Sequence, residues 1–254
     1  MHITIVLPLT RKLRIPRIKE DIRAIKTEHK ISLVAISDSN TISVGMLEDL
    51  CKGYDAKVYS FNRPGASDIN ISARRARISE VFNKARTMIP ADADMVFCVE
   101  DDTELRPDYL EKLLAVYKTM SLKDNVGIVS GVQPGRWGFK MIGAWKADDI
   151  DEPTVLQTVP YQKDGLVDYI DAAGLYCFVT SRESFCNTEF YYNSFGPDVN
   201  FGLELRRKGL KNFIDWTVNA GHVTPSRTLY VDQECVVVKY VKIDGQWQLV
   251  NPKV

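Results

Sequence analysis

Three consecutive acids end one of the most apolar stretches of the chain. Residues 95–99 read MVFCV, a run typical of a buried strand, and Glu100, Asp101 and Asp102 follow it directly. Adjacent carboxylates raise one another's pKa unless a cation or hydrogen-bond donors compensate them. Asp102 with one flanking acid could coordinate a hard divalent cation, Mg²⁺ or Mn²⁺, which would in turn bind a diphosphate. The alternative is that the acids lie in a surface turn and cap a helix that begins near Pro107.

Alternating strand and helix patterns place these acids at one edge of a sheet. Short runs rich in β-branched residues alternate with helical spacing, which predicts an α/β fold whose mostly parallel central sheet is flanked by helices. In open sheets of this kind, ligands bind outside the carboxyl ends of the strands. Asp38, which ends the second predicted strand, should therefore lie near the acidic cluster. The expected strands cover residues 3–7, 31–36, 56–61, 95–99 and 126–130, and the expected helices 16–29, 44–52, 72–88, 108–120 and 198–209.

The second half of the chain is less regular. Residues 131–165 are rich in Gly, Pro, Trp and Asp, which indicates short strands and a long functional loop. Strand patterns return at 166–180, and Ser181 is a natural helix start. Residues 239–250 alternate around Asp244-Gly245, which predicts a C-terminal β-hairpin with a tight turn.

The composition bears on the partners of the protein and on its cellular compartment. Lys plus Arg and Asp plus Glu number 33 each, so bulk charge gives no argument for a nucleic-acid or membrane partner. The five Cys are widely spread and form no CxxC or zinc spacing, which favours reduced core thiols in a cytosol-like compartment. No run approaches the roughly 20 apolar residues of a membrane span. We expect a cytoplasmic protein without integral membrane association.

Four short segments together carry a family resemblance that none of them would carry alone. In chain order they read VAISDSN, NISARRARISEVFNKA, VEDDTELRPDYLEKL and SFGPDVNFGLELRRKGLKNFIDWTVNAGHV. On the expected elements and in this order, they resemble the GT-A glycosyltransferases, most closely the family 2-like enzymes. The resemblance covers roughly residues 1–225. It implies a catalytic domain over 1–225, with a nucleotide-sugar-binding half (1–130) and an acceptor-binding half (131–225), followed by a C-terminal extension (226–254) that holds the hairpin.

On the donor side, the resemblance implies a nucleotide sugar, with a UDP-sugar as the expected donor, and Mn²⁺ or Mg²⁺ as cofactor. Glu100 and Asp102 match the first and last positions of a DxD motif, and His222 matches a third metal ligand. The Glu departs from the motif, which leaves Asp102 as the stronger ligand; for His222, a turn residue is the alternative. A solvated helix face is the favoured alternative for Arg75 and Arg77. The residues assigned to nucleotide binding are Pro8, Thr10, Asp38, Arg75 and Asp101.

On the acceptor side, the resemblance implies that Asp198 deprotonates the acceptor hydroxyl in a single, inverting displacement. The alternative is that Asp198 caps the helix over 198–209. Pro197 replaces a Glu that commonly precedes the base. The residues assigned to acceptor binding are Trp137, Asp171 and Gly174. Aromatic faces stack on sugars, so Trp137 and Trp145 could line the pocket or, equally, pack in the core. For Asp171 and Gly174, the alternative is a buried strand with a bend.

Several functional readings stay open. The acceptor could be a glycan, a small molecule, a lipid-linked sugar, a protein or a hydroxylated base in DNA, since residues 11–17, 74–75 and 206–208 are basic. Residues 133–137 spell QxxRW, a signature of processive polysaccharide synthases. In those enzymes the motif follows the catalytic base, whereas in this sequence it precedes Asp198, which argues against a processive synthase. A nucleotidyltransferase is a competing hypothesis, although LPLTRKLR lacks the expected glycine-rich loop. A third hypothesis is a non-catalytic domain that binds a sugar or a nucleic acid.

Overall fold

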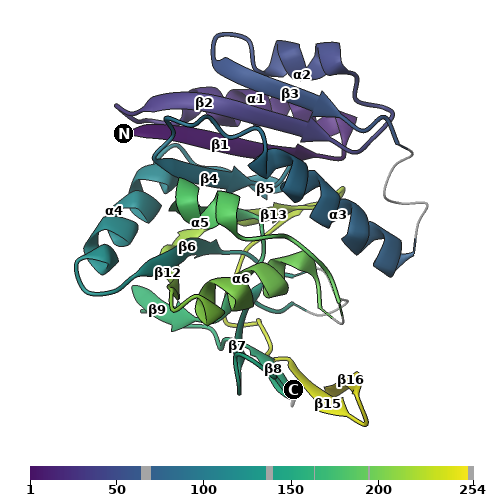
Figure 1. Ribbon diagram of the computed structural model, residues 1–254, viewed down its shortest axis with the longest axis vertical. Helices are drawn as coiled ribbons and strands as arrows, with labels where there is room; N and C mark the ends of the chain where they lie inside the picture. Colours follow the sequence, from purple (N-terminus) through teal and green to yellow (C-terminus); the bar gives the residue numbers. More distant parts are fainter. Residues whose placement is uncertain (64–69, 136–139, 163, 194, 251–254) are drawn as a thin grey trace.

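The computed structural model of the protein describes residues 1–63, 70–135, 140–162, 164–193 and 195–250. Its main element is an eight-stranded sheet in the order β3-β2-β1-β4-β11-β6-β12-β9 (Figure 1). Strands β1 to β4 run parallel to their neighbours among themselves, as do β6 and β12, whereas β11 and β9 run antiparallel to theirs. The predicted α/β fold with a mainly parallel central sheet is therefore confirmed. The strands are β1 (His2–Leu9), β2 (Lys30–Ser37), β3 (Asp55–Ser60), β4 (Met95–Val99), β6 (Val126–Val132), β9 (Val167–Ile170), β11 (Cys177–Ser181) and β12 (Lys211–Asn219).

Helices cover both faces of this sheet, because alternate side chains of the central strands are apolar in both directions. Along β1, Ile3, Ile5 and Leu7 belong to the cluster that contains the apolar stripes of α1, α2 and α4. Val6 of the same strand belongs to the opposite cluster, with residues of α3, α5 and α6. The helices are α1 (Ile15–Ala24), preceded by the 3-10 turn η1 (Lys12–Arg14), α2 (Val44–Leu50), α3 (Ile71–Arg86), α4 (Tyr109–Ser121), α5 (Arg182–Asn187) and α6 (Pro197–Arg207).

Two smaller sheets complete the fold. A five-stranded sheet has the order β10-β7-β8-β15-β16, and a three-stranded one the order β14-β13-β5. The predicted C-terminal hairpin is confirmed as β15 and β16; its turn residues Asp244 and Gly245 have φ of 48° and 78°, the left-handed region that a tight two-residue hairpin turn needs. The strands are β5 (Thr103–Glu104), β7 (Ala144–Ala147), β8 (Val155–Thr158), β10 (Ala172–Ala173), β13 (Gly221–Val223), β14 (Thr228–Leu229), β15 (Lys239–Ile243) and β16 (Gln246–Val250).

Most of the predicted boundaries agree with the structure within two residues, and the first helix is the main exception. The helix predicted over 16–29 ends at Ala24, because Ile25 leaves the helical region with ψ of 123°. The residues after Ala24 are held by α4 and by the segment that precedes it. The Lys26 N–H donates to the carbonyl of Pro107, and the Thr27 hydroxyl donates to Glu111. In the described ranges, no helix has the length and apolar character that crossing a membrane requires.

Candidate functional site

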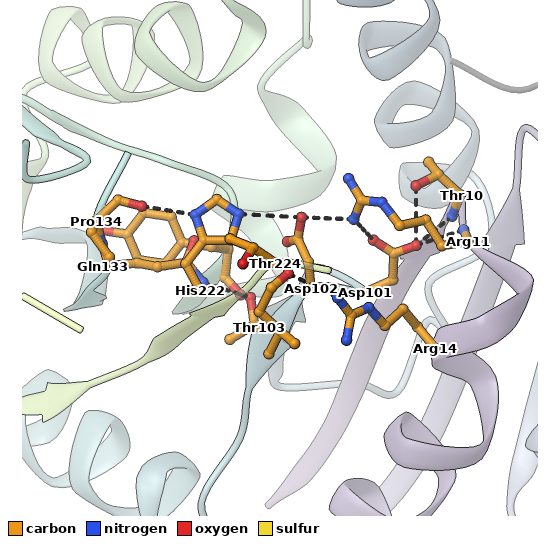
Figure 2. A network of polar contacts seen from close by, with 12 residues as sticks. Thr10, Arg11, Arg14, Asp101, Asp102, Thr103, Gln133, Pro134, His222 and Thr224 are labelled. Atoms are coloured by element: carbon orange, nitrogen blue, oxygen red, sulfur yellow. Dashed lines mark hydrogen bonds and ion pairs between the residues drawn. The ribbon is translucent and has the colours of Figure 1, made fainter. Parts of the chain in front are cut away.

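The loop after β1 is tied to the acidic cluster through Asp101. One carboxylate oxygen of Asp101 accepts from the backbone N–H groups of Thr10 and Arg11, at 2.7 and 2.8 Å, and from the Thr10 hydroxyl at 3.0 Å. The other oxygen accepts from the Arg11 guanidinium at 2.9 Å (Figure 2). Asp101 therefore fixes the shape of this loop. Neither Asp101 nor Asp102 caps α4, which begins after Asp108 without any side-chain cap.

Asp102 faces His222 and is bound by Arg11. The Arg11 guanidinium donates to Oδ2 of Asp102 at 2.7 Å, and the same oxygen lies 3.5 Å from Nε2 of His222 (Figure 2). On the other side of the ring, Nδ1 lies 2.9 Å from the carbonyl oxygen of Pro134, which can only accept, so Nδ1 carries a proton. The guanidinium thus supplies part of the compensation that the adjacent acids require.

A short antiparallel pairing delivers His222 to this position from far along the chain. In the pairing of β13 with β5, His222 lies opposite Thr103, the residue that follows Asp102. The Val223 N–H donates to the carbonyl of Asp102 at 2.7 Å. These contacts make His222 a strand residue and not the turn residue of the alternative reading.

The distance between Asp102 and His222 is compatible with two protein ligands of one divalent cation. Bonds of about 2.1 Å place neighbouring ligands of an octahedral ion about 3 Å apart, close to the observed 3.5 Å. The contact from Nδ1 to Pro134 orients the ring, as outer-shell partners of metal-bound histidines do. Among the described residues, no group of three or more His, Cys, Asp or Glu side chains is gathered to hold a metal ion. The two residues could supply two ligands to a divalent cation that takes its other ligands from water, in a position now shared with the Arg11 guanidinium.

Asp38 is locked by an arginine from α3. Its Oδ2 accepts from Nε of Arg77 at 2.9 Å, and Nη2 of Arg77 donates to the Asp38 carbonyl at 2.6 Å. Arg77 is only 8 % exposed, so the favoured alternative of a solvated helix face is wrong for this residue. Oδ1 of Asp38 is buried and has no hydrogen-bond partner among the described residues. Burial raises the pKa of Asp38, and the charge of Arg77 opposes that rise.

A cavity of about 630 Å³ opens between α3, the start of α6 and the smaller sheets. It brings together five of the residues that the sequence singled out: Arg75, Glu100, Gly174, Asp198 and His222. The backbone of Glu100 is fixed by its N–H, which donates to the carbonyl of Tyr176 at 3.1 Å. The cavity therefore places the proposed base and two of the three proposed metal ligands at one site.

Asp198 lies at the second position of α6. The N-cap of that helix is Gly196 and makes no side-chain cap, so the reading of Asp198 as the N-cap is wrong. A Cβ at position 196 would collide with Oδ1 of Asp198, so only glycine leaves the carboxylate where it is. Burial raises the pKa of Asp198, while the Val199 N–H and the charge of Arg75 oppose the rise. A raised pKa makes the carboxylate a better proton acceptor near neutral pH.

The remaining predicted residues lie elsewhere. Asp171 does not line the cavity; its carboxylate accepts from the Tyr169 hydroxyl at 2.7 Å, from Ala147 N–H at 3.0 Å and from Arg206 Nε at 3.2 Å, which ties β9, β7 and α6 together. Gly174 does line it, and a Cβ there would lie 2.5 Å from the Tyr176 ring. Trp137 lies outside the described residues. Pro8, Thr10, Asp38, Asp101 and Asp102 are not among the residues that line the cavity.

Sequence reasoning missed three contributors to the site. Arg11 stood out only as part of a basic stretch, although it is the cation that bridges Asp101 and Asp102. Gln133, noted only within QxxRW, lines the cavity and donates from Nε2 to the Thr103 hydroxyl at 3.1 Å. Gly196 carried no signal beyond preceding Pro197. A cation a few residues beyond the first strand, facing an acidic strand end, is the pattern that could have identified Arg11.

The fold is similar to that of a known glycosyltransferase. No family model and no curated protein sequence matches the chain. Among solved structures, the mannosyltransferase PcManGT from Pyrobaculum calidifontis in complex with GDP-Man and Mn²⁺ has a TM-score of 0.57 at 13 % identity; the match covers 89 % of this chain and 57 % of that one. A mycobacterial protein has a TM-score of 0.50 at 16 % identity, covering 98 % and 82 %. A protein from STIV has a TM-score of 0.49 at 13 % identity, covering 99 % of each chain. The first match shows a glycosyltransferase-like, GT-A-type fold.

Proposed function

We propose that this protein is a metal-dependent, inverting glycosyltransferase that moves a sugar from a nucleotide sugar to an acceptor hydroxyl. One observation carries the proposal: Asp198, Glu100 and His222 line a single cavity, and Nε2 of His222 lies 3.5 Å from Oδ2 of Asp102. The GT-A-type fold supports the assignment, and the mannosyltransferase with that fold is bound to GDP-Man and Mn²⁺.

The donor side would hold the nucleotide and the cation. Asp102 and His222 are the protein ligands we propose for Mn²⁺ or Mg²⁺, with Glu100 nearby in the cavity wall. When bound, the ion would stabilise the negative charge that develops on the leaving diphosphate. Oδ1 of Asp38 is an acceptor without a hydrogen-bond partner among the described residues; because it is buried and does not line the cavity, a base N–H would reach it only if the side chains around it moved. A UDP-sugar remains the donor we expect.

Asp198 would act on the acceptor. Its carboxylate would take the proton of the acceptor hydroxyl as that oxygen forms a bond to the anomeric carbon, while the bond from that carbon to the diphosphate breaks. Attack from the face opposite the leaving group inverts the anomeric configuration. Burial of Asp198 beside the cavity raises its pKa, which matches this role.

The competing functions find less support in the geometry. A nucleotidyltransferase would use the loop after β1 to cradle phosphates, but the N–H groups of Thr10 and Arg11 already donate to Asp101. A DNA acceptor was suggested by basic residues, yet several of them are in ion pairs with acids of this chain, such as Arg17 with Glu104 and Arg207 with Glu204. We therefore propose a glycan or small-molecule acceptor.

A donor screen tests the proposal directly. The protein is incubated with UDP-, GDP- and dTDP-sugars in the presence of Mn²⁺, Mg²⁺ or a chelator, and released nucleotides are quantified. We expect a nucleoside diphosphate to be released from one donor class, only with a divalent cation. Pyrophosphate release would identify a nucleotidyltransferase instead. Nucleotide-sugar binding without turnover against a broad acceptor panel would favour a binding domain.

A further inference from the structure

The C-terminal hairpin forms one wall of the cavity. Strand β15 pairs with β8, so the hairpin extends the sheet that contains β7, β8 and β10 (Figure 1). Three of its side chains line the same cavity as Asp198: Tyr240, Trp247 and Leu249. The hairpin lies outside residues 1–225, the part of the chain that carries the sequence resemblance to glycosyltransferases.

The wall built around the hairpin is apolar. The Trp247 ring contacts the ring of Phe195, and the two centroids are 4.4 Å apart. Phe195 directly precedes Gly196, the glycine that lies against the Asp198 carboxylate. The adjoining cavity residues belong to one hydrophobic cluster, whose members that line the cavity are Met141, Trp145, Leu156 and Val199. The wall thus reaches from the hairpin to the position of the proposed base.

The hairpin side chains of this wall are not fully buried by packing, unlike Leu156 and Val199 beside them, which are 2 % and 5 % exposed. Leu249 is 44 % exposed although it lines the cavity, and Tyr240 and Trp247 are only partly buried. Concave sites with aromatic and aliphatic walls and a few polar groups are typical of small-molecule binding. The polar groups of this cavity include Asp198, Glu100, His222, Arg74 and Arg75. The charge of Arg75 opposes the rise that burial causes in the pKa of Tyr240, whereas the other two hairpin side chains, Trp247 and Leu249, offer a ring and methyl groups.

We propose that the hairpin is an acceptor-binding element and that the acceptor carries an apolar group, an aryl or alkyl aglycone, beside its reacting hydroxyl. This inference rests on the proposed function, because Asp198 defines which end of the cavity receives the hydroxyl. A second sugar ring could stack one face on Trp247, but its hydroxyl groups would lose hydrogen bonds to water against the neighbouring aliphatic side chains Val199 and Leu249, which makes it a poorer occupant of the hairpin side. An apolar group loses none and buries the exposed wall.

Matched glycosides test this inference on the full chain. Calorimetry with the nucleoside diphosphate and Mn²⁺ present compares methyl, phenyl and octyl glycosides of the same sugars. We expect the phenyl or octyl member to bind at least about tenfold more tightly than the methyl member. The phenyl and octyl arms separate an aromatic from an alkyl aglycone. Trp247→Ala should abolish the preference, Trp247→Phe should keep most of it, and Gln248→Ala, an exposed residue of the same strand, should leave it unchanged.

The outcomes separate this inference from the proposed function. Equal binding of methyl and apolar glycosides, no glycoside binding at all, or a preference that survives in a folded Trp247→Ala protein would each overturn the hairpin site. Nucleotide binding is measured in separate titrations without glycoside. Its absence, with the apolar preference intact, would count against glycosyl transfer and leave the hairpin site standing.

Discussion

The acids that follow strands β2 and β4 and the acid at the start of α6 are held in different ways. Asp38 and Asp102 are 3 % and 2 % exposed, and each accepts from an arginine, Arg77 at 2.9 Å and Arg11 at 2.7 Å. Asp198 instead lines the cavity and is positioned by the backbone of α6 and by a glycine. Fixed, paired carboxylates suit the organisation of a nucleotide and a cation. A carboxylate that faces an open cavity suits proton transfer.

The largest effect is expected from a change at Asp198, which tests whether this acid differs in function from Asp38 and Asp102. Asp198→Asn keeps the shape of the side chain but removes the proton acceptor, so transfer should fall about 10²- to 10⁴-fold. Nucleoside diphosphate binding should be nearly unchanged, because the proposed mechanism has Asp198 contact the acceptor and not the nucleotide. Steady-state kinetics and calorimetry on the same preparation measure both quantities.

The matched donor-side variant is Asp102→Asn, which should weaken cation-dependent nucleotide binding. The two variants therefore separate binding from transfer. Wild-type turnover in Asp198→Asn would remove Asp198 from the mechanism and require another base in the cavity.

The second prediction concerns the stability that the pairing of Asp38 with Arg77 contributes. Arg77→Met leaves the buried Asp38 carboxylate without its cation, which should lower the free energy of unfolding by about 3–5 kcal/mol. Arg74→Met, an exposed change on the same helix, should alter it by no more than about 0.5 kcal/mol. Urea denaturation measures both, and Asp38→Asn combined with Arg77→Met should recover part of the loss. Equal stability of the two arginine variants would show that the Asp38 pair is not a structural lock.

The third prediction moves Asp198 without removing it. Gly196→Ala would push Oδ1 of Asp198 aside, because the added Cβ meets that oxygen and not the backbone. Transfer should fall about 10- to 100-fold, as small displacements of catalytic groups do, with little change in unfolding. Gly45→Ala is the control: a Cβ there meets nothing within 4 Å, and an alanine inside α2 should be neutral or stabilising. Unchanged transfer in Gly196→Ala would mean that the carboxylate position is not critical.

Much of the fold follows from local patterns, whereas the site depends on contacts that join distant parts of the chain. The strand ends at Asp38 and Asp102 and the helix start near Asp198 could be predicted because hydrophobic periodicity marks those elements. Strands β5 and β13 are too short to show a period, so the sequence alone placed His222 near Asp102 only by resemblance. The pairing of Arg11 with Asp101 and Asp102 spans about 90 residues, and no local rule encodes it.

The burial of Arg77 shows the same limit. Arg75 and Arg77 look alike as basic residues near the start of a polar helix, yet Arg77 is buried against Asp38 while Arg75 lines the cavity. Which of two neighbouring arginines turns inward depends on the rotation of α3 against β2, and that rotation is set by packing of the apolar face of the helix. Sequence spacing alone could not distinguish them.

The smallest expected effect sharpens the comparison through pH. Because burial raises the pKa of Asp198 in the folded state, its ionisation destabilises the fold. Asp198→Asn should therefore unfold at a slightly higher temperature than the wild type at neutral pH. The difference should shrink as pH falls through the raised pKa and vanish below the ordinary aspartate pKa, where both side chains are neutral. Thermal unfolding of both proteins from acidic to neutral pH measures this difference.

The opposite pattern would carry its own meaning. If the wild type were the more stable protein at neutral pH and lost that advantage in acid, the charged carboxylate would be stabilised in the fold, with the Arg75 charge outweighing burial. Asp198 would then resemble the arginine-paired acids Asp38 and Asp102. A carboxylate stabilised in that way is a weaker proton acceptor, so the assignment of Asp198 as the base would have to be reconsidered. The contrast between Asp198 and the arginine-paired acids would be lost as well.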